Sequence, residues 1–145
     1  MQYNEEFWNK YADENESRYN KEFSKYVKDL ASSLPTVQSV LEIGCGTGID
    51  LRLFPDSFQL HGIDLNEHAL EIAKEKLSFA DFQKGNITEL PFEDSSIDFV
   101  FTHGLMNYLD DDVLEKGIAE MHRVSKKWIM HCEKYEKTAY WYPNF

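Results

Sequence analysis

The feature that most constrains this 145-residue chain is a mostly apolar run, residues 40–43, that leads into a glycine turn at residues 44–48. This pattern predicts a buried strand that breaks at the glycines and then opens a helix. Asp64 follows twenty residues after Gly44, at the end of a second apolar run. Glycines let a nucleotide-like ligand lie against the backbone, and an acid at the tip of the next strand can accept hydrogen bonds from two ribose hydroxyls. The pair therefore predicts a site for an adenosine-containing cofactor.

Strand-like and helix-like patterns alternate along the chain. Strands are expected over residues 37–43, 58–64, 80–84, 97–102 and 128–133, and helices over 21–34, 48–54, 66–77 and 110–124. Apolar strands between amphipathic helices predict an α/β, Rossmann-like, doubly wound sheet of about five parallel strands with helices on both faces. Right-handed crossovers bring the carboxyl ends of the strands to one edge, where ligands bind.

The length suits a single domain, residues 1–145. We expect an N-terminal helical arm or lid over residues 1–34, a cofactor-binding core over 35–133 and a tail over 134–145. The first twenty residues are polar, yet they carry several aromatic side chains: Tyr3, Phe7, Trp8, Tyr11 and Tyr19. Charge favours a mobile surface arm and the aromatics favour a docked one, so both alternatives remain open.

The net charge of −11 disfavours nucleic acid as a partner, because phosphate backbones repel an acidic surface without clustered basic residues. No apolar stretch approaches the ~20 residues that cross a bilayer, and the acidic start of the chain does not resemble a secretory signal. Cys45 and Cys132 lie in apolar runs, as expected of reduced thiols. We therefore expect a cytoplasmic protein without a membrane partner. The five histidines lack zinc-ligand spacing, so no metal site is expected.

Several motifs in order resemble the class I S-adenosylmethionine-dependent methyltransferases. Residues 40–48 are similar to the first motif of that family and residues 62–65 to the second; residues 85–92 resemble its adenine loop and 98–101 its fourth strand. The match covers most of the chain, about residues 37–133. It implies a methyltransferase with S-adenosylmethionine as cofactor and a small-molecule methyl acceptor.

The resemblance also implies residue roles. The glycines Gly44, Gly46 and Gly48 would contact the methionine part, and Glu42 would fix their turn. Asp64 would bind the ribose. The remaining cofactor contacts that the resemblance implies are Cys45, Leu65, Asn86, Ile87, Thr102 and, from the arm, Tyr11 and Arg18. The family usually has Asp at position 86, but the Asn86 amide oxygen can still accept a hydrogen bond from the adenine amino group.

His103 is the candidate catalytic residue. It follows the fourth strand, beside the end of the first, and should lie near the reactive methyl group. An ordinary histidine pKa of about 6.5 suits the removal of a hydroxyl or amine proton. The alternative, a histidine that shapes the loop or contacts the cofactor carboxylate, remains open. Glu133 and Tyr135 are candidates for the acceptor pocket, whereas His122, Arg123 and His131 are expected to be structural.

A narrower set of residues resembles the methylases associated with pseudaminic acid biosynthesis. These residues are Phe7, Trp8, Arg18, Glu133, Tyr135 and the segments 102–105 and 124–130. The likeness implies a sugar or nonulosonic-acid-type acceptor. The wider family adds an antiparallel hairpin after the fifth strand, which twelve further residues cannot form. The chain is thus either minimal or truncated, and we expect its tail or a second subunit, in a homodimer, to cover the fifth-strand edge.

Two other functions remain open. A non-catalytic module that binds S-adenosylmethionine and completes a partner enzyme would explain the exposed strand. A nicotinamide dehydrogenase would share the strand–turn–helix start, but its usual G-x-G-x-x-G spacing differs from that of Gly44, Gly46 and Gly48. Titration with S-adenosylhomocysteine and with NAD distinguishes the dehydrogenase from the other two.

Overall fold

The computed structural model describes residues 3–133. In chain order the elements are α1 (Glu5–Asp13), the 3-10 helix η1 (Asn15–Arg18), α2 (Lys21–Ser33), β1 (Ser39–Ile43), η2 (Ile49–Leu51), β2 (Gln59–Asp64), α3 (Glu67–Lys76), β3 (Asp81–Lys84), β4 (Ile97–His103), η3 (Met106–Tyr108), α4 (Asp111–Val124) and β5 (Ser125–Cys132). The strands form one parallel sheet in the order β3-β2-β1-β4-β5. This order reverses between β1 and β4, where a ligand crevice forms in open α/β sheets.

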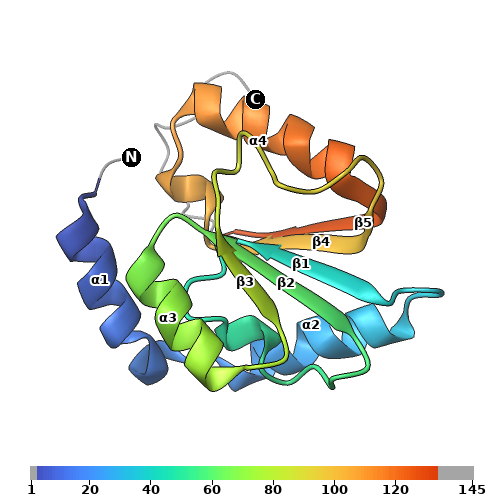
Figure 1. The fold of residues 1–145 in the computed structure, drawn as a ribbon, viewed down its shortest axis with the longest axis horizontal. Coiled ribbons are helices and arrows are strands. Elements are labelled where there is room, and N and C mark those ends of the chain that lie inside the picture. Colours follow the sequence, from blue (N-terminus) through green and yellow to red (C-terminus); the bar gives the residue numbers. More distant parts are fainter. Residues whose placement is uncertain (1–2, 134–145) are drawn as a thin grey trace, which may run out of the picture.

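Helices cover both faces of the sheet, α2 and α3 on one and α4 on the other (Figure 1). A hydrophobic cluster lies between the sheet and the helices on each face. Successive strand residues point to opposite faces, so Val40 joins the cluster under α2 and α3 while Leu41 joins the cluster under α4. On β4, Phe99 likewise joins the cluster under α2 and α3, and Val100 joins the cluster under α4. Both faces are thus buried, and the predicted Rossmann-like, doubly wound class is confirmed.

Two elements, β5 and η2, differ most from the predicted ranges. Strand β5 begins at Ser125, three residues before the predicted start, because α4 ends at Val124 and Ser125 already pairs with Ile97 in β4. A register shift follows, after which Trp128 pairs with Phe99. The predicted helix over residues 48–54 shortens to the single turn η2. Apolar content alone could not set these limits, since both depend on how neighbouring backbone pairs.

Strand β5 is an edge of the sheet within residues 3–133, because its partner β4 lies on one side and no described strand lies on the other. Trp128 on this strand is 39% exposed. The tail that was expected to cover this edge, residues 134–145, lies outside the described residues. None of the helices in residues 3–133 is long and apolar enough to cross a membrane.

The N-terminal arm is helical and docks against α3 and the segment that follows β1. Helix α1 packs on α3, and polar side chains of α1 and η1 bond to the core. The contacts are Asn9 with Asn66 (2.7 Å), Asp13 with His68 (2.6 Å), Asn15 with Thr47 (2.8 Å) and Glu16 with Arg52 (2.5 Å). Of the two alternatives for the arm, the structure therefore has the docked one.

Candidate active site

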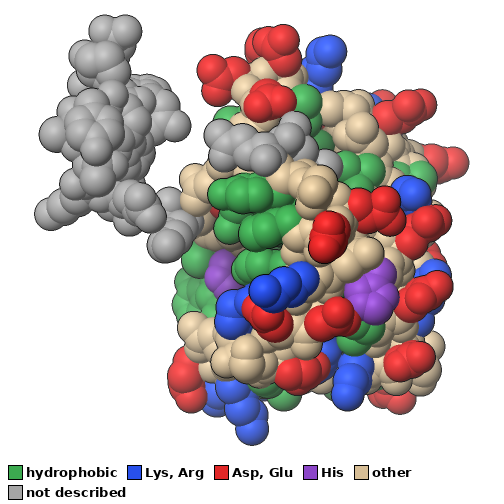
Figure 2. Space-filling model, turned by 90° about the vertical axis from the view of Figure 1, so that its left-hand side faces the viewer, with side chains coloured by type: hydrophobic (Ala, Val, Ile, Leu, Met, Phe, Trp, Pro, Cys, Tyr) green, Lys and Arg blue, Asp and Glu red, His purple; other side chains and the backbone are tan. Residues whose placement is uncertain are grey.

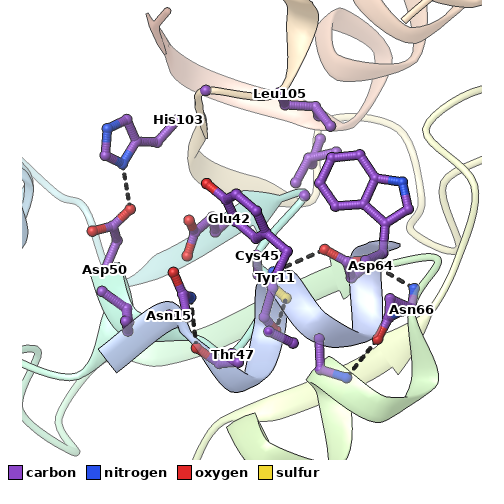
Figure 3. Close-up of a pocket in the computed structure, with 18 of the residues that line it drawn as sticks. Tyr11, Asn15, Glu42, Cys45, Thr47, Asp50, Asp64, Asn66, His103 and Leu105 are labelled. Atoms are coloured by element: carbon purple, nitrogen blue, oxygen red, sulfur yellow. Dashed lines mark hydrogen bonds and ion pairs between the residues drawn. The ribbon is translucent and has the colours of Figure 1, made fainter. Parts of the chain in front are cut away.

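A cavity of about 300 Å³ opens at the carboxyl edge of the sheet, between the arm and the strand ends (Figure 3). Its wall combines residues far apart in sequence: Trp8, Tyr11, Asn15, Arg18 and Tyr19 from the arm, Glu42 to Thr47 and Asp50 from β1 and its turn, Asp64 to Asn66 from β2, and Gly85, Ile87, His103, Leu105 and Tyr108 from later loops. Of the thirteen predicted site residues, ten lie in this wall. The three others are Gly48, Asn86 and Thr102.

The glycine turn that the sequence predicted is present, and its backbone is left-handed. Gly44 and Gly46 have φ angles of 73° and 51°, which residues other than glycine rarely adopt. Gly44 N and Cys45 N both donate to Ile63 O, at 2.7 and 3.1 Å. These bonds join the turn to the end of β2, so its backbone is fixed before any ligand arrives.

Asp64 connects the turn to the start of α3. One carboxylate oxygen accepts from Gly46 N and the other from Asn66 N, each at 2.8 Å. Burial raises the pKa of Asp64 above its ordinary value, although these backbone donors oppose the shift. Asp64 is thus a partly desolvated carboxylate at the edge of a cavity, which suits the recognition of paired hydroxyls. Leu65 beside it is 44% exposed and offers an apolar surface on the same rim.

Glu42 is the buried acid of the site. Only 3% of the residue is exposed, and its Oε2 has no hydrogen-bond partner among residues 3–133. Burial raises the pKa of Glu42 well above its ordinary value, and the charges of Asp50 and Asp64 raise it further. An orphaned buried acceptor in a cavity wall fits a cationic ligand group, because such a group would satisfy the acceptor and offset the burial of its charge.

The three predicted residues outside the wall have other contacts. Gly48 lies against Phe82: a Cβ atom added to Gly48 would be 2.7 Å from Phe82 Cζ. Asn86 is exposed, and its Oδ1 accepts from the backbone N and the hydroxyl of Thr88. Thr102 is buried and donates to Glu133. Cofactor contacts by these three stay predictions, and each would need a rearrangement or a ligand that extends beyond the cavity.

Tyr11 and Arg18 bring the arm into the wall. The Arg18 guanidinium lies 3.7 Å from the centre of the Tyr11 ring, bonds the Tyr11 carbonyl oxygen and pairs with Glu14. Its partners therefore all belong to the arm. Three aromatic side chains of the arm are exposed: Tyr3, Phe7 and Tyr11. Figure 2 shows hydrophobic side chains gathered on the face that carries α1.

His103 lies in the wall at the end of β4. Its Nδ1 is 2.6 Å from Asp50 Oδ2, and its ring stacks on Phe23 with ring centres 3.8 Å apart. In Figure 3 this pair lies at one end of the view and Asp64 at the other. Sequence reasoning missed Asp50. The signal for it was an acid two residues after Gly48, inside an otherwise apolar turn.

The other polar candidates lie away from the cavity wall. Glu133 accepts from Thr102 Oγ1 at 2.9 Å and from Met106 N at 2.9 Å, so it ties η3 to the end of β5. Arg123 bonds Glu120 and the carbonyl oxygens of Leu90 and Phe92. Tyr135 lies outside the described residues. Among residues 3–133 no group of three or more His, Cys, Asp or Glu side chains is arranged to hold a metal ion.

Known proteins share this architecture. Residues 40–127 match the family model described as "Methyltransferase domain". A demethylmenaquinone methyltransferase of Staphylococcus aureus is 39% identical over 111 residues, which cover 70% of this chain and 44% of that protein. A TehB-like S-adenosylmethionine-dependent methyltransferase of Corynebacterium glutamicum has the same fold, with a TM-score of 0.70 at 20% identity over 87% of this chain and 73% of its own.

A third similar protein is phosphoethanolamine N-methyltransferase 1 of Haemonchus contortus, solved with phosphoethanolamine and S-adenosylhomocysteine. It has a TM-score of 0.65 at 27% identity, over 83% of this chain and 28% of its own. The chain spans about 40% of the length of the curated relatives it matches.

The fold, the glycine turn and Asp64 define a Rossmann-like domain for an adenosine-containing cofactor. The chain belongs to the methyltransferase domain family, in its class I, S-adenosylmethionine-dependent branch. The cofactor of this family is S-adenosylmethionine. The residues present fit it, because the orphaned Glu42 acceptor suits the cationic methionine ammonium and the Asp64 carboxylate suits the ribose hydroxyls.

Proposed function

We propose that this domain transfers a methyl group from S-adenosylmethionine to a hydroxyl or amine of a small molecule, and that the acceptor is a sugar or nonulosonic-acid-type compound. The observation that carries the proposal is that one cavity wall holds Asp64, Glu42 and His103 together. The first two suit the cofactor, and His103 is a base that can receive the acceptor proton.

The bound cofactor would supply an electrophilic methyl group next to a positively charged sulfur. Asp64 would hold the ribose, Leu65 and Ile87 would pack on the adenine, and Glu42 would accept from the methionine ammonium. Arg18 would exchange its pairing with Glu14 for the methionine carboxylate, a charge-assisted bond. The main task of the protein is then to align acceptor, methyl and sulfur, which can supply at best roughly 7–11 kcal/mol.

Aromatic residues support a ring-shaped acceptor. Trp8, Tyr11, Tyr19 and Tyr108 line the cavity, and the Trp8 and Tyr108 rings meet edge to face at 5.1 Å. Sugar rings present apolar C–H faces to aromatic side chains and hydroxyls to polar ones, so this lining suits them. The names of two similar proteins indicate other acceptors, a quinone ring and the amine of phosphoethanolamine. Both should therefore be tested beside the sugars.

The test is single-turnover transfer of a labelled methyl group. Stoichiometric protein and labelled S-adenosylmethionine are mixed with nucleotide sugars and nonulosonic acids, a soluble quinol, or phosphoethanolamine. We expect label in the sugar fraction only. Transfer to the quinol or the amine would contradict the acceptor class. Binding of S-adenosylhomocysteine without transfer to any acceptor would favour the alternative, a non-catalytic cofactor-binding module that completes a partner enzyme, in which the β5 edge is the partner site.

We also propose that the protein is cytoplasmic and has no nucleic-acid or membrane partner. We propose further that it forms a homodimer through the β5 edge. The unpaired cysteines Cys45 and Cys132 and the net charge of −11 support the first two parts. The position of β5 at the edge of the sheet within residues 3–133 supports the dimer. Sedimentation tests the dimer: the parent should sediment as a dimer and the Trp128→Lys variant as a monomer.

Replacing Glu42 by Gln should weaken cofactor binding and change the pH dependence of stability. Loss of a hydrogen bond from the charged methionine ammonium to Glu42, about 1.5–3 kcal/mol, corresponds to a roughly 10- to 100-fold higher Kd for S-adenosylhomocysteine. Because the pKa of Glu42 is raised in the folded state, the folded protein holds this proton more tightly than the unfolded chain. The Glu42 proton therefore stabilises the folded state fully when the pH is below the ordinary Glu pKa of 4.5. This stabilisation is lost as the pH rises through the raised pKa of the folded state.

Without cofactor, the Tm of the Glu42→Gln protein should therefore exceed that of the parent at pH 8, and the difference should shrink toward pH 5. Calorimetry measures both effects. The exposed Glu71→Gln is the matched control and should track the parent. Parallel Tm curves for the parent and Glu42→Gln would contradict the assignment of a protonated buried acid.

Substitution of the arm residues tests the lid. The double variant Tyr11→Ala/Arg18→Ala removes the stacked pair from the cavity wall while leaving the Asn15–Thr47 and Glu16–Arg52 contacts. We expect about 10-fold weaker binding of S-adenosylhomocysteine, since one charge-assisted hydrogen bond is lost. Calorimetric titration measures it. Binding as tight as that of the parent would remove the lid role.

A further inference from the structure

Asp50 is a buried carboxylate that the cofactor contacts proposed above do not use. It lies on η2, two residues beyond Gly48, and is 7% exposed. It forms part of the cavity wall together with His103. A carboxylate held at the base of such a cavity needs partners that offset its lost hydration.

Those partners come from two other elements of the fold. Asp50 Oδ2 lies 2.6 Å from His103 Nδ1, and Asp50 Oδ1 accepts from Ser24 Oγ on α2 at 3.1 Å. Phe23, also on α2, stacks on the imidazole ring at an interplanar angle of 26°. Figure 3 shows the bond that joins the two labelled side chains, Asp50 and His103. The imidazole is thus restrained by one strong hydrogen bond and one ring contact.

The carboxylate also decides which ring nitrogen carries the proton. An ionised carboxylate only accepts hydrogen bonds, so Nδ1 must be the protonated nitrogen of a neutral His103. The lone pair is then on Nε2. We infer that Asp50 is a positioning residue, which holds His103 in the tautomer whose Nε2 accepts the proton of the methyl acceptor. This inference rests on the proposed function.

The proton balance of the transfer requires such a group. As the acceptor oxygen or nitrogen forms its bond to the methyl carbon, the carbon–sulfur bond breaks and its electron pair returns to sulfur. The acceptor loses one proton, which passes to His103 Nε2 and leaves an imidazolium. Asp50 stabilises that cation through the bond to Nδ1, and no further reactant is needed.

Three further acidic groups lie near the pair. Glu42 lies beside Asp50, Cys132 pairs with His103 in the sheet, and Glu133 follows Cys132. Burial raises the pKa of both Glu42 and Cys132, which favours their neutral forms. Asp50, whose Oδ2 lies 2.6 Å from Nδ1, is therefore the acid that stabilises the imidazolium by direct contact.

The test is the tautomer of His103, read from nitrogen-15 NMR of its ring in the protein saturated with S-adenosylhomocysteine. The variant His103→Gln assigns the signals. We expect Nδ1–H in the parent. In Asp50→Asn the side-chain amide can donate to Nδ1, which moves the ring proton to Nε2. Methyl transfer in a single turnover should fall at least about 10-fold, while the Kd of S-adenosylhomocysteine changes less than about 2-fold.

Asp81→Asn is the matched control. Asp81 pairs with His61 at 3.4 Å, outside the arm and the cavity wall, so its loss should leave the His103 signals and the transfer rate unchanged. Asp50→Ala provides a second variant if Asp50→Asn does not fold. Nε2–H in the parent, or the same tautomer in parent and Asp50→Asn, would refute the positioning role alone. Failure of the parent to transfer to any acceptor would refute the proposed function as well.

Discussion

Replacing Asp64 by Ala should abolish useful cofactor binding. Two hydrogen bonds from ribose hydroxyls to a carboxylate contribute about 1.5–3 kcal/mol each, so their loss corresponds to a roughly 10²- to 10⁴-fold higher Kd for S-adenosylhomocysteine. The variant also removes the acceptor for Gly46 N and Asn66 N, which loosens the turn that the cofactor would lie against. Isothermal titration measures the Kd, and thermal unfolding of the unliganded variant reports the structural part.

Two further variants separate binding from folding. Asp64→Asn keeps the size of the side chain and an acceptor oxygen for one of the two backbone donors, so it should lose less stability than Asp64→Ala and still bind more weakly. Asp56→Ala removes an exposed acid outside the cavity wall and should change neither property. If Asp64→Ala bound S-adenosylhomocysteine within a few-fold of the parent, this carboxylate would not hold the ribose.

Replacing Gly48 by Ala should cost the most stability of the substitutions considered. Gly48 has φ of 71°, and a left-handed backbone costs a non-glycine residue about 1–2 kcal/mol. The new Cβ would also lie 2.7 Å from Phe82 Cζ and 3.3 Å from Ala73 Cβ. Overpacking in a dense core costs typically about 1–3 kcal/mol, so the total loss is about 2–5 kcal/mol. Urea unfolding measures it.

Gly104→Ala is the natural comparison. Gly104 has a similar φ of 63°, but no atom lies within 4 Å of a Cβ placed there. It should therefore lose only the backbone contribution, about 1–2 kcal/mol. A Gly48→Ala protein no less stable than Gly104→Ala would mean that Phe82 moves aside without penalty, and that the glycine is needed for the turn alone.

The strand ends show how much of the site the sequence could predict. Gly44, Gly46 and Asp64 were found from spacing, because parallel strands with apolar residues bring their carboxyl ends to one edge. His103 reached the cavity by the same rule, as the last residue of β4. Asn86 and Thr102 followed it too, yet their side chains turn to Thr88 and Glu133 instead. Spacing places a residue at an edge but does not orient its side chain.

Other features depend on contacts between distant segments. The arm was ambiguous in sequence because polar and aromatic residues point to opposite outcomes; Asn15 with Thr47 and Glu16 with Arg52 decide it in favour of docking. Asp50 carried no motif, and its contact with His103, fifty-three residues away, is visible only in the tertiary structure. The early start of β5 likewise follows from pairing with β4 rather than from its own residues.

The sequence by itself determined the sheet, its two buried faces, the glycine turn and the acid at the end of β2. These features rest on periodicity and on backbone conformations that only certain residues adopt. The tertiary structure alone decided which side chains share the cavity, which arm residues line it and which nitrogen of His103 faces Asp50. Those properties arise from hydrogen bonds and packing between segments that no local pattern connects.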